Sequence, residues 1–184
     1  MHPQKCAGGS VSLLIKKHFS DDLTDIYFDN GRRNNHPDFL EVLERANKPI
    51  DSYFKFAVIR NTWDRVVSMY FHAKKHLNYH KPFEDFVLRD GISGKRFFKP
   101  FHMKPKLTFN DEYIIDFTIR HENFEKDVDY VMNRLGIQDY SLTHCTHHTG
   151  RDVADYRTFY NQQTTDFVYN IFKWEINKFN YKFQ

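Results

Sequence analysis

A buried strand that runs directly into an amphipathic helix is the feature that most constrains the fold of this chain. Residues 54–59 (FKFAVI) have the length and apolar composition of a strand that is buried on at least one face. Apolar side chains then recur with the spacing of one helical face, at Trp63, Val66, Val67, Tyr70 and Phe71. A strand followed at once by a helix predicts an α/β layer fold, in which ligands bind at the carboxyl ends of the strands.

Other segments continue this alternation of strands and helices. We expect further strands at residues 23–28 and 113–119, and further helices at residues 124–135 and 163–178. The other local signals are a turn at Asn30-Gly31, a helix stop at Gly136, and short helices from Pro37 and around Phe83 and Phe86. The sequence has no internal repeat, so we predict one domain over residues 1–184, with a small, mainly parallel sheet flanked by helices.

The composition favours an anionic ligand and disfavours several other classes of protein. The chain has 184 residues and a net charge of +3, which is too small a charge for a dedicated nucleic-acid binder. Two cysteines, Cys6 and Cys145, do not make a disulfide framework, which favours a reducing compartment. The apolar runs are too short to cross a membrane and no signal peptide precedes the first motif, so we expect a cytoplasmic protein.

Residues 5–10 (KCAGGS) form the first candidate site, a loop of small residues that opens a helix. Ser10 is predicted to cap this helix, which has Val11 and Leu14 on its apolar face. Glycines let the backbone approach a ligand closely, and a helix start offers N–H groups and the positive end of a dipole. With the Lys5 charge and the Ser10 hydroxyl group, these features indicate a cradle for phosphate or sulfate. On this motif alone, an ordinary glycine-containing turn stays open as an alternative.

Residues 60–68 (RNTWDRVVS) form the second candidate site. Arg60 ends the buried strand and Ser68 lies on the following helix. A guanidinium group in this place can bind a phosphate through two parallel hydrogen bonds. We expect Asp64 and Arg65 to pair with other groups and hold the loop. On this motif alone, a solvated helix start with incidental charges is an equal alternative.

Together, these motifs resemble the sulfotransferases that use 3′-phosphoadenosine 5′-phosphosulfate (PAPS), in particular the carbohydrate sulfotransferase branch. Residues 2–10 resemble the family's 5′-phosphosulfate loop, and residues 54–70 resemble its strand and 3′-phosphate motif. Residues 116–137 and 156–183 resemble its third block and its closing tyrosine-rich helix. The resemblance spans nearly the whole chain in family order. It implies an enzyme that transfers a sulfuryl group from PAPS to a hydroxyl group, with a carbohydrate as the expected acceptor.

The resemblance also implies a P-loop-like three-layer fold. Relatives place a buried strand immediately before the first loop, whereas only Met1 and His2 precede Pro3 here, so we expect this first strand to be truncated. The first loop departs from the family pattern, since Gln4 separates Pro3 from Lys5 and Gly9 stands where a threonine is common. The second motif is the closer match.

The resemblance assigns a role to each matching residue at the donor site. Lys5 would contact the 5′-phosphosulfate and stabilise the leaving phosphate oxygen. Backbone N–H and hydroxyl groups would hold the same group, from Gly8, Gly9 and Ser10. The 3′ phosphate would be bound by Arg60 and Ser68, and Arg151 would close over the cofactor.

The acceptor hydroxyl group needs a base, which relatives supply as a His or Glu after the second strand. His36 matches that position, and its ordinary pKa of about 6.5 suits proton abstraction. Glu41 and His2 are the other candidates. Transfer by this route needs no metal, and the cluster His144–His148 fits no zinc-ligand spacing.

Two other functions remain open from the sequence. A truncated, non-catalytic relative would bind a glycan or a nucleotide without turnover. A small P-loop kinase would prefer ATP with magnesium, although the GK[ST] order and an acidic magnesium ligand after a strand are missing. The acceptor site is expected on the variable segments 72–110 and 139–157.

Overall fold

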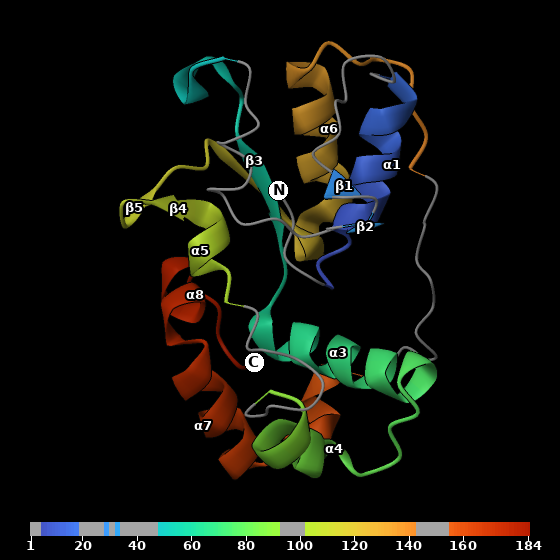
Figure 1. Ribbon diagram of the computed structural model, residues 1–184, viewed down its shortest axis with the longest axis vertical. Helices are drawn as coiled ribbons and strands as arrows, with labels where there is room; N and C mark the ends of the chain where they lie inside the picture. Colours follow the sequence, from blue (N-terminus) through green and yellow to red (C-terminus); the bar gives the residue numbers. More distant parts are fainter. Residues whose placement is uncertain (1–4, 19–27, 30–31, 34–47, 93–101, 143–154) are drawn as a thin grey trace. The chain divides into compact units, whose positions relative to one another are not determined.

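The structure is a computed structural model that describes residues 5–18, 28–29, 32–33, 48–92, 102–142 and 155–184. Contacts between residues divide the chain into two compact units. The first, here called the sheet unit, consists of Met1–Ile59 and Met103–Cys145. The second, the helical unit, consists of Arg60–His102 and Thr146–Gln184. Figure 1 labels most of the helices and strands of both units. The single domain expected over residues 1–184 stays a prediction.

Two parallel strands carry the buried interior of the sheet unit. β3 (Phe56–Ile59) pairs with β6 (Phe117–Arg120), with Phe56 opposite Phe117 and Ile59 opposite Arg120. Ala57, Val58, Ile59 and Ile119 are buried, as expected where apolar side chains cover both faces of a parallel pair. The strand predicted at residues 54–59 is thereby confirmed, and the chain is an α/β protein with a short parallel sheet.

A helix follows β6 after the 3₁₀ turn His121–Asn123. α6 spans Phe124–Arg134, and Asp127 Oδ2 accepts a hydrogen bond of 2.7 Å from the Arg120 backbone N–H, which ties the helix start to the strand end. Its buried side chains are Val128, Val131 and Met132. Gly136 has a φ of 75°, a left-handed conformation that glycine adopts without steric cost. The predicted helix and its glycine stop are both confirmed.

Two short antiparallel hairpins also belong to the sheet unit. β4 (Thr108–Phe109) pairs with β5 (Glu112–Tyr113), and Asn110 and Asp111 between them have φ values of 49° and 64°. Two successive residues with positive φ make the tight turn that matches the twist of a hairpin. The strand predicted at residues 113–119 is confirmed only from Phe117 onward, where β6 begins, because Tyr113 ends the hairpin instead.

The second hairpin corrects another strand prediction. β1 (Phe28–Asp29) pairs with β2 (Arg32–Arg33) on either side of the predicted Asn30-Gly31 turn. Of the strand expected at residues 23–28, only Phe28 lies within the described residues, and its partner is antiparallel. The parallel pairing found in the described part of the chain thus joins β3 and β6 alone.

The other elements of the sheet unit are helical. α1 spans Gly8–His18 and buries Val11 and Leu14. A 3₁₀ turn covers Ile50–Ser52, and α5 covers Lys104–Leu107. The helix expected from Pro37 lies outside the described residues.

The helical unit is built from short helices around aromatic side chains. Its elements are α3 (Thr62–His76), α4 (Phe83–Asp85), a π-helical turn (Phe86–Asp90), a 3₁₀ turn (Tyr156–Phe159), α7 (Gln162–Ile171) and α8 (Lys173–Lys178). The Tyr70 ring on α3 makes edge-to-face contacts with Phe83 and Tyr79, at centroid distances of 5.4 and 6.1 Å. The predicted stripe on α3 is confirmed, since Trp63, Val66, Val67 and Tyr70 are buried and Phe71 is half-buried.

The helix expected over residues 163–178 is broken at Phe172, which ends α7 and precedes α8. Phe172 is buried, and the guanidinium carbon of Arg65 lies 5.1 Å from the centroid of its ring. Arg65 is 0% exposed and forms an ion pair with Glu175, which is 1% exposed. The Thr62 hydroxyl group donates a 3.1 Å hydrogen bond to the same carboxylate. The break therefore brings a carboxylate of α8 against a buried cation of α3.

Within the described residues, the helices are too short or too polar for a membrane-crossing segment.

Candidate functional site

Asn61 caps the start of α3, two residues after the end of β3. The Asn61 side chain accepts hydrogen bonds from the backbone N–H groups of Trp63 (3.0 Å) and Asp64 (3.4 Å). Its own carbonyl oxygen accepts from the Arg65 N–H at 2.8 Å. An asparagine in this role satisfies donors that a helix start leaves unpaired. Recognition of an anion beside this junction must therefore rely on side chains, because Asn61 occupies two of the helix-start N–H groups.

Removing the Asn61 cap should destabilise the protein. We expect Asn61→Ala to lower the free energy of unfolding by about 1 kcal/mol, because the two N–H groups lose their acceptor. Chemical denaturation followed by circular dichroism measures this change. Asn61→Asp keeps the acceptor and should stay near wild type, whereas an unchanged midpoint for Asn61→Ala would show that the cap carries no stability.

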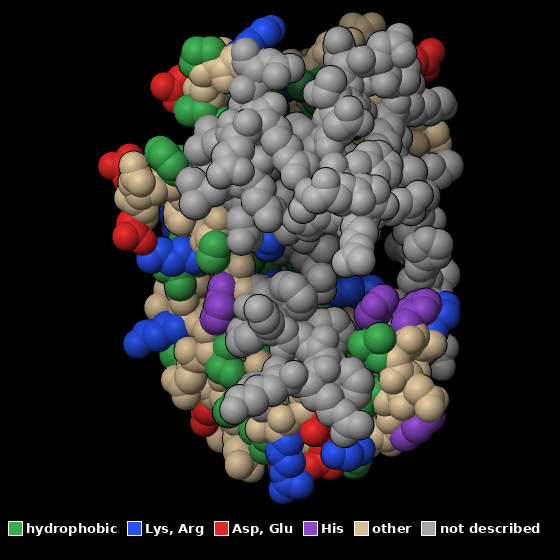
Figure 2. Space-filling model, viewed as in Figure 1, with side chains coloured by type: hydrophobic (Ala, Val, Ile, Leu, Met, Phe, Trp, Pro, Cys, Tyr) green, Lys and Arg blue, Asp and Glu red, His purple; other side chains and the backbone are tan. Residues whose placement is uncertain are grey.

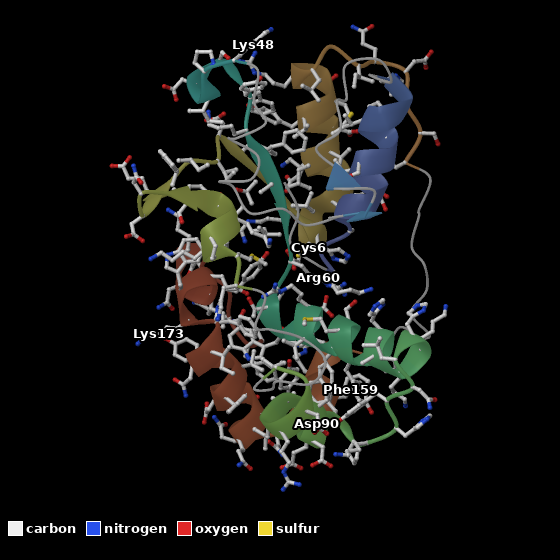
Figure 3. All side chains as sticks on the ribbon, in the orientation of Figure 1. Cys6, Lys48, Arg60, Asp90, Phe159 and Lys173 are labelled. Carbon is white, nitrogen blue, oxygen red and sulfur yellow. The ribbon has the colours of Figure 1, made fainter. Side chains whose placement is uncertain are left out.

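Arg60 is oriented by Asp64, one helical turn further along the chain. Arg60 Nε and Asp64 Oδ2 lie 2.6 Å apart, and the two side chains are 13% and 15% exposed. Figure 3 labels Arg60 at the junction between β3 and α3. This ion pair fixes the orientation of the Arg60 guanidinium group. The expectation that Asp64 and Arg65 pair with other groups is confirmed, with Arg60 and Glu175 as their partners.

Ser68 lies on the same face of α3 as Asp64. The two residues are four positions apart on one helix, a spacing that places side chains one above the other. Arg60, Asp64 and Ser68 therefore form one row, here called the Arg60 row. Ser68 is buried, so only a group packed directly against α3 can reach its hydroxyl group.

Aromatic and backbone groups from the end of the chain surround the Asn61 cap. The Tyr160 hydroxyl group donates to the Trp63 carbonyl oxygen at 2.9 Å, and the Tyr156 hydroxyl group donates to the Gln184 carbonyl oxygen at 3.0 Å. Asn61 Nδ2 lies 3.5 Å from the Tyr156 hydroxyl oxygen. Burial raises the pKa of Tyr156 above its usual value, so this phenol stays neutral and keeps its donor hydrogen.

The Lys5 loop enters α1 through two left-handed residues. Lys5 and Ala7 have φ values of 63° and 64°, an uncommon conformation for residues with a side chain. The helix begins at Gly8, so the prediction that Ser10 caps it is wrong, and Ser10 is the third helical residue. The Ser10 N–H instead donates to the Ala7 carbonyl oxygen at 3.1 Å. The turn is thus made by the non-glycine residues, whereas Gly8 and Gly9 belong to the first helical turn.

Gly8 and Gly9 differ in their surroundings. Gly8 is buried and Gly9 is exposed. A Cβ atom built on Gly9 would meet no other atom within 4 Å, so the packing of the described residues does not require glycine there. Cys6, between the two left-handed residues, is buried and anchors the loop to the interior.

Several predicted site residues lie outside the described residues. They are His36 and Arg151, the two other base candidates Glu41 and His2, and the histidine cluster His144–His148. Among the residues that the structure does describe, no group of three or more His, Cys, Asp or Glu side chains is arranged to hold a metal ion.

The described site residues form two groups of similar chemistry. The Lys5 loop with Gly8, Gly9 and Ser10 belongs to the sheet unit, and the Arg60 row belongs to the helical unit. Each group combines one cation and one hydroxyl group near the start of a helix, and side chains of these two kinds recognise phosphate or sulfate oxygens. Sequence reasoning missed the role of Asn61 as a cap, although asparagine directly before a helical stripe is a recognised signal. It also missed Tyr156 and Tyr160, which no local pattern links to α3.

The comparisons with known proteins give a relative but no function. No family model matches the chain, and no solved structure matches it. A protein of Archaeoglobus fulgidus, described as uncharacterized, is 30% identical over 99 residues. The match covers 51% of this chain and 77% of the archaeal protein.

Proposed function

The chain belongs to the same family as the archaeal protein, and we propose that it is a sulfotransferase that moves a sulfuryl group from PAPS to a hydroxyl group, with a carbohydrate as acceptor. The observation that carries this proposal is the Arg60 row at the carboxyl end of β3. The row presents the Arg60 guanidinium group, held by Asp64 just before α3, and the Ser68 hydroxyl group on α3. These groups suit the 3′ phosphate, which distinguishes PAPS from simple nucleotides.

The Lys5 loop supplies the groups that the 5′-phosphosulfate requires. Lys5 brings a positive charge, and the left-handed Lys5 and Ala7 turn the backbone sharply into α1. The open space beside Gly9 leaves room for a ligand oxygen near the first helical turn. Helix-start N–H groups and a neighbouring ammonium group both favour an anion in that position.

The reaction is a direct in-line transfer. The acceptor oxygen attacks the sulfur of PAPS, and the bond between sulfur and the 5′-phosphate oxygen breaks. His36 takes the proton of the acceptor hydroxyl group, and Lys5 stabilises the charge on the leaving phosphate oxygen. The products are a sulfate ester and 3′-phosphoadenosine 5′-phosphate (PAP). Arg151 closes over the donor, and no step requires a metal ion.

The proposal includes the type of α/β fold, the number of domains and the location in the cell. The short parallel sheet with a helix after each strand is compatible with a P-loop-like three-layer fold. The enzyme would act as one domain in the cytoplasm.

A transfer assay tests the proposed function. The protein is incubated with PAPS and a panel of sugars, and mass spectrometry follows the formation of PAP and of a sulfated sugar. We expect PAP to appear in step with one sulfated product. Binding of PAP without turnover of any acceptor would favour the non-catalytic alternative, and absence of both binding and turnover would overturn the proposal.

Replacing the proposed base should affect the chemistry and not the donor affinity. We expect His36→Ala to lower kcat by about 10²–10⁴-fold while the affinity for PAP stays near wild type. His80→Ala is the matched control, because His80 is exposed and its Nε2 lies 2.7 Å from Asn78 Oδ1 on the surface. Equal turnover of His36→Ala and wild type would remove His36 as the base, and Glu41 and His2 would be tested next.

A further inference from the structure

Two histidines lie one turn apart in the last part of α3. The ring centroids of His72 and His76 are 4.6 Å apart, and the rings are inclined by 41°. His76 is exposed and His72 is half-buried. The last turn of α3 also holds Lys74 and Lys75. Figure 2 shows His and Lys or Arg side chains gathered over this end of the helix.

The spacing of the two rings suits a shared metal ion. A zinc ion binds imidazole nitrogens at about 2.0–2.1 Å, so two nitrogens on one ion lie roughly 3–3.5 Å apart. Ring centroids 4.6 Å apart are compatible with this separation between one nitrogen of each ring. Histidines at positions i and i+4 of a helix project from the same face, so the backbone already holds both ligands in register.

The helix dipole and the neighbouring lysines have opposite effects on a cation at this pair. The last turn of a helix carries the negative end of the helix dipole. Lys74 is drawn to another face, since its Nζ lies over the Tyr70 ring at 5.5 Å from the centroid. Lys75 is three positions from His72, and its charge weakens the site without blocking the exposed His76 ring.

We propose that His72 and His76 together bind one divalent transition-metal ion, of the class that prefers imidazole ligands. Zinc, nickel and copper belong to this class, whereas magnesium prefers oxygen ligands. Water completes the coordination shell, since the described residues hold no third ligand group there. Once one imidazole has bound, the second binds at a high effective concentration, which makes the pair a stronger ligand than either ring alone. The proposed sulfuryl transfer itself requires no metal ion.

Calorimetry with zinc chloride on untagged protein tests the proposal. The cluster His144–His148 also carries three histidines, so the experiment starts from a background variant with His144→Ala, His147→Ala and His148→Ala. We expect this variant to bind one zinc ion and to give no heat with magnesium. Adding His76→Ala should weaken zinc binding by at least about tenfold, because the chelate is lost. Adding His80→Ala in place of His76→Ala should leave the affinity unchanged.

Two results would overturn the proposal. One is a background variant that binds no zinc, and the other is equal zinc affinity with and without His76→Ala. Circular dichroism of the metal-free variants checks that the fold is kept, as expected for the exposed His76 at the end of α3. His76→Gln is a second variant for the zinc titration, since it keeps a polar side chain and removes the imidazole ligand. It should weaken zinc binding as His76→Ala does.

Discussion

Glu175→Gln should lower the free energy of unfolding by about 3–5 kcal/mol, because it leaves the Arg65 guanidinium group buried without a countercharge. Arg65 is 0% exposed and Glu175 is 1% exposed, so water cannot take over the lost interaction. The Thr62 hydroxyl group donates to the same carboxylate and loses its charged acceptor. A loss of this size is a large share of the 5–15 kcal/mol that typically stabilises a folded protein. Urea denaturation of variant and wild type measures the difference.

The matched control is an exposed ion pair in the same unit. Arg89 and Asp85 lie 2.9 Å apart, with side chains 76% and 28% exposed, and Asp85→Asn should cost less than about 1 kcal/mol. Replacing both buried partners, with Arg65→Leu and Glu175→Leu together, should restore part of the stability lost in Glu175→Gln, since no charge is then left buried. Equal losses for Glu175→Gln and Asp85→Asn would contradict the importance of this ion pair.

Arg60→Ala should weaken the binding of PAP by roughly 10- to 150-fold while the fold is retained. The estimate is the loss of one charge-assisted contact to phosphate, about 1.5–3 kcal/mol, expressed as a ratio of dissociation constants. Arg60 is only 13% exposed but is bound to Asp64 at the start of α3, so its removal leaves an anionic side chain beside the proposed phosphate. Isothermal titration calorimetry with PAP measures the change.

A second ligand shows whether Arg60 contacts the 3′ phosphate or only adds positive charge to the protein. Adenosine 5′-phosphate lacks the 3′ phosphate, so its affinity should be nearly the same for Arg60→Ala and wild type. Arg89→Ala, which removes an exposed arginine of the same unit, should leave PAP binding unchanged. An Arg60→Ala variant that binds PAP as tightly as wild type would exclude Arg60 from the donor site.

Sequence patterns predicted the elements whose conformation depends on neighbouring residues in the chain. The α3 stripe from Trp63 to Phe71 has the spacing of a helical face, and the helix lies where that spacing places it. Gly136 stops α6 because it adopts a positive φ at no steric cost, which is a property of one residue. The same reasoning fails at Asn110-Asp111, because this turn is made by two residues with side chains and positive φ, and the apolar pattern of residues 113–119 continues across the end of the hairpin.

Contacts between distant segments account for the remaining errors. The break at Phe172 contains neither glycine nor proline, and it coincides with the burial of Phe172 beneath Arg65. The partner of Arg65 is 110 positions away, at Glu175. No periodicity or spacing rule links residues so far apart, although a buried charge on the apolar side of α3 requires a partner from some other element.

In the candidate site, too, short-range features were predicted from the sequence and contacts between distant segments were not. The sequence predicted the place of Arg60 at a strand end and of Ser68 on the next helix, because the strand and the helix are contiguous in the chain. It did not predict that Asn61 would hold the helix start or that Tyr160 would donate to the Trp63 carbonyl oxygen. It also placed Ser10 at the cap, whereas the left-handed Ala7 precedes α1 three residues earlier and the helix begins at Gly8.

The wild-type protein should distinguish PAP from adenosine 5′-phosphate, which has no phosphate on its 3′ oxygen. Calorimetric titrations with the two ligands under the same conditions measure this difference directly. Binding of PAP at least about tenfold tighter than adenosine 5′-phosphate is the predicted result. Equal affinity for the two ligands, or no binding of PAP, would contradict the assignment of this protein as a sulfotransferase.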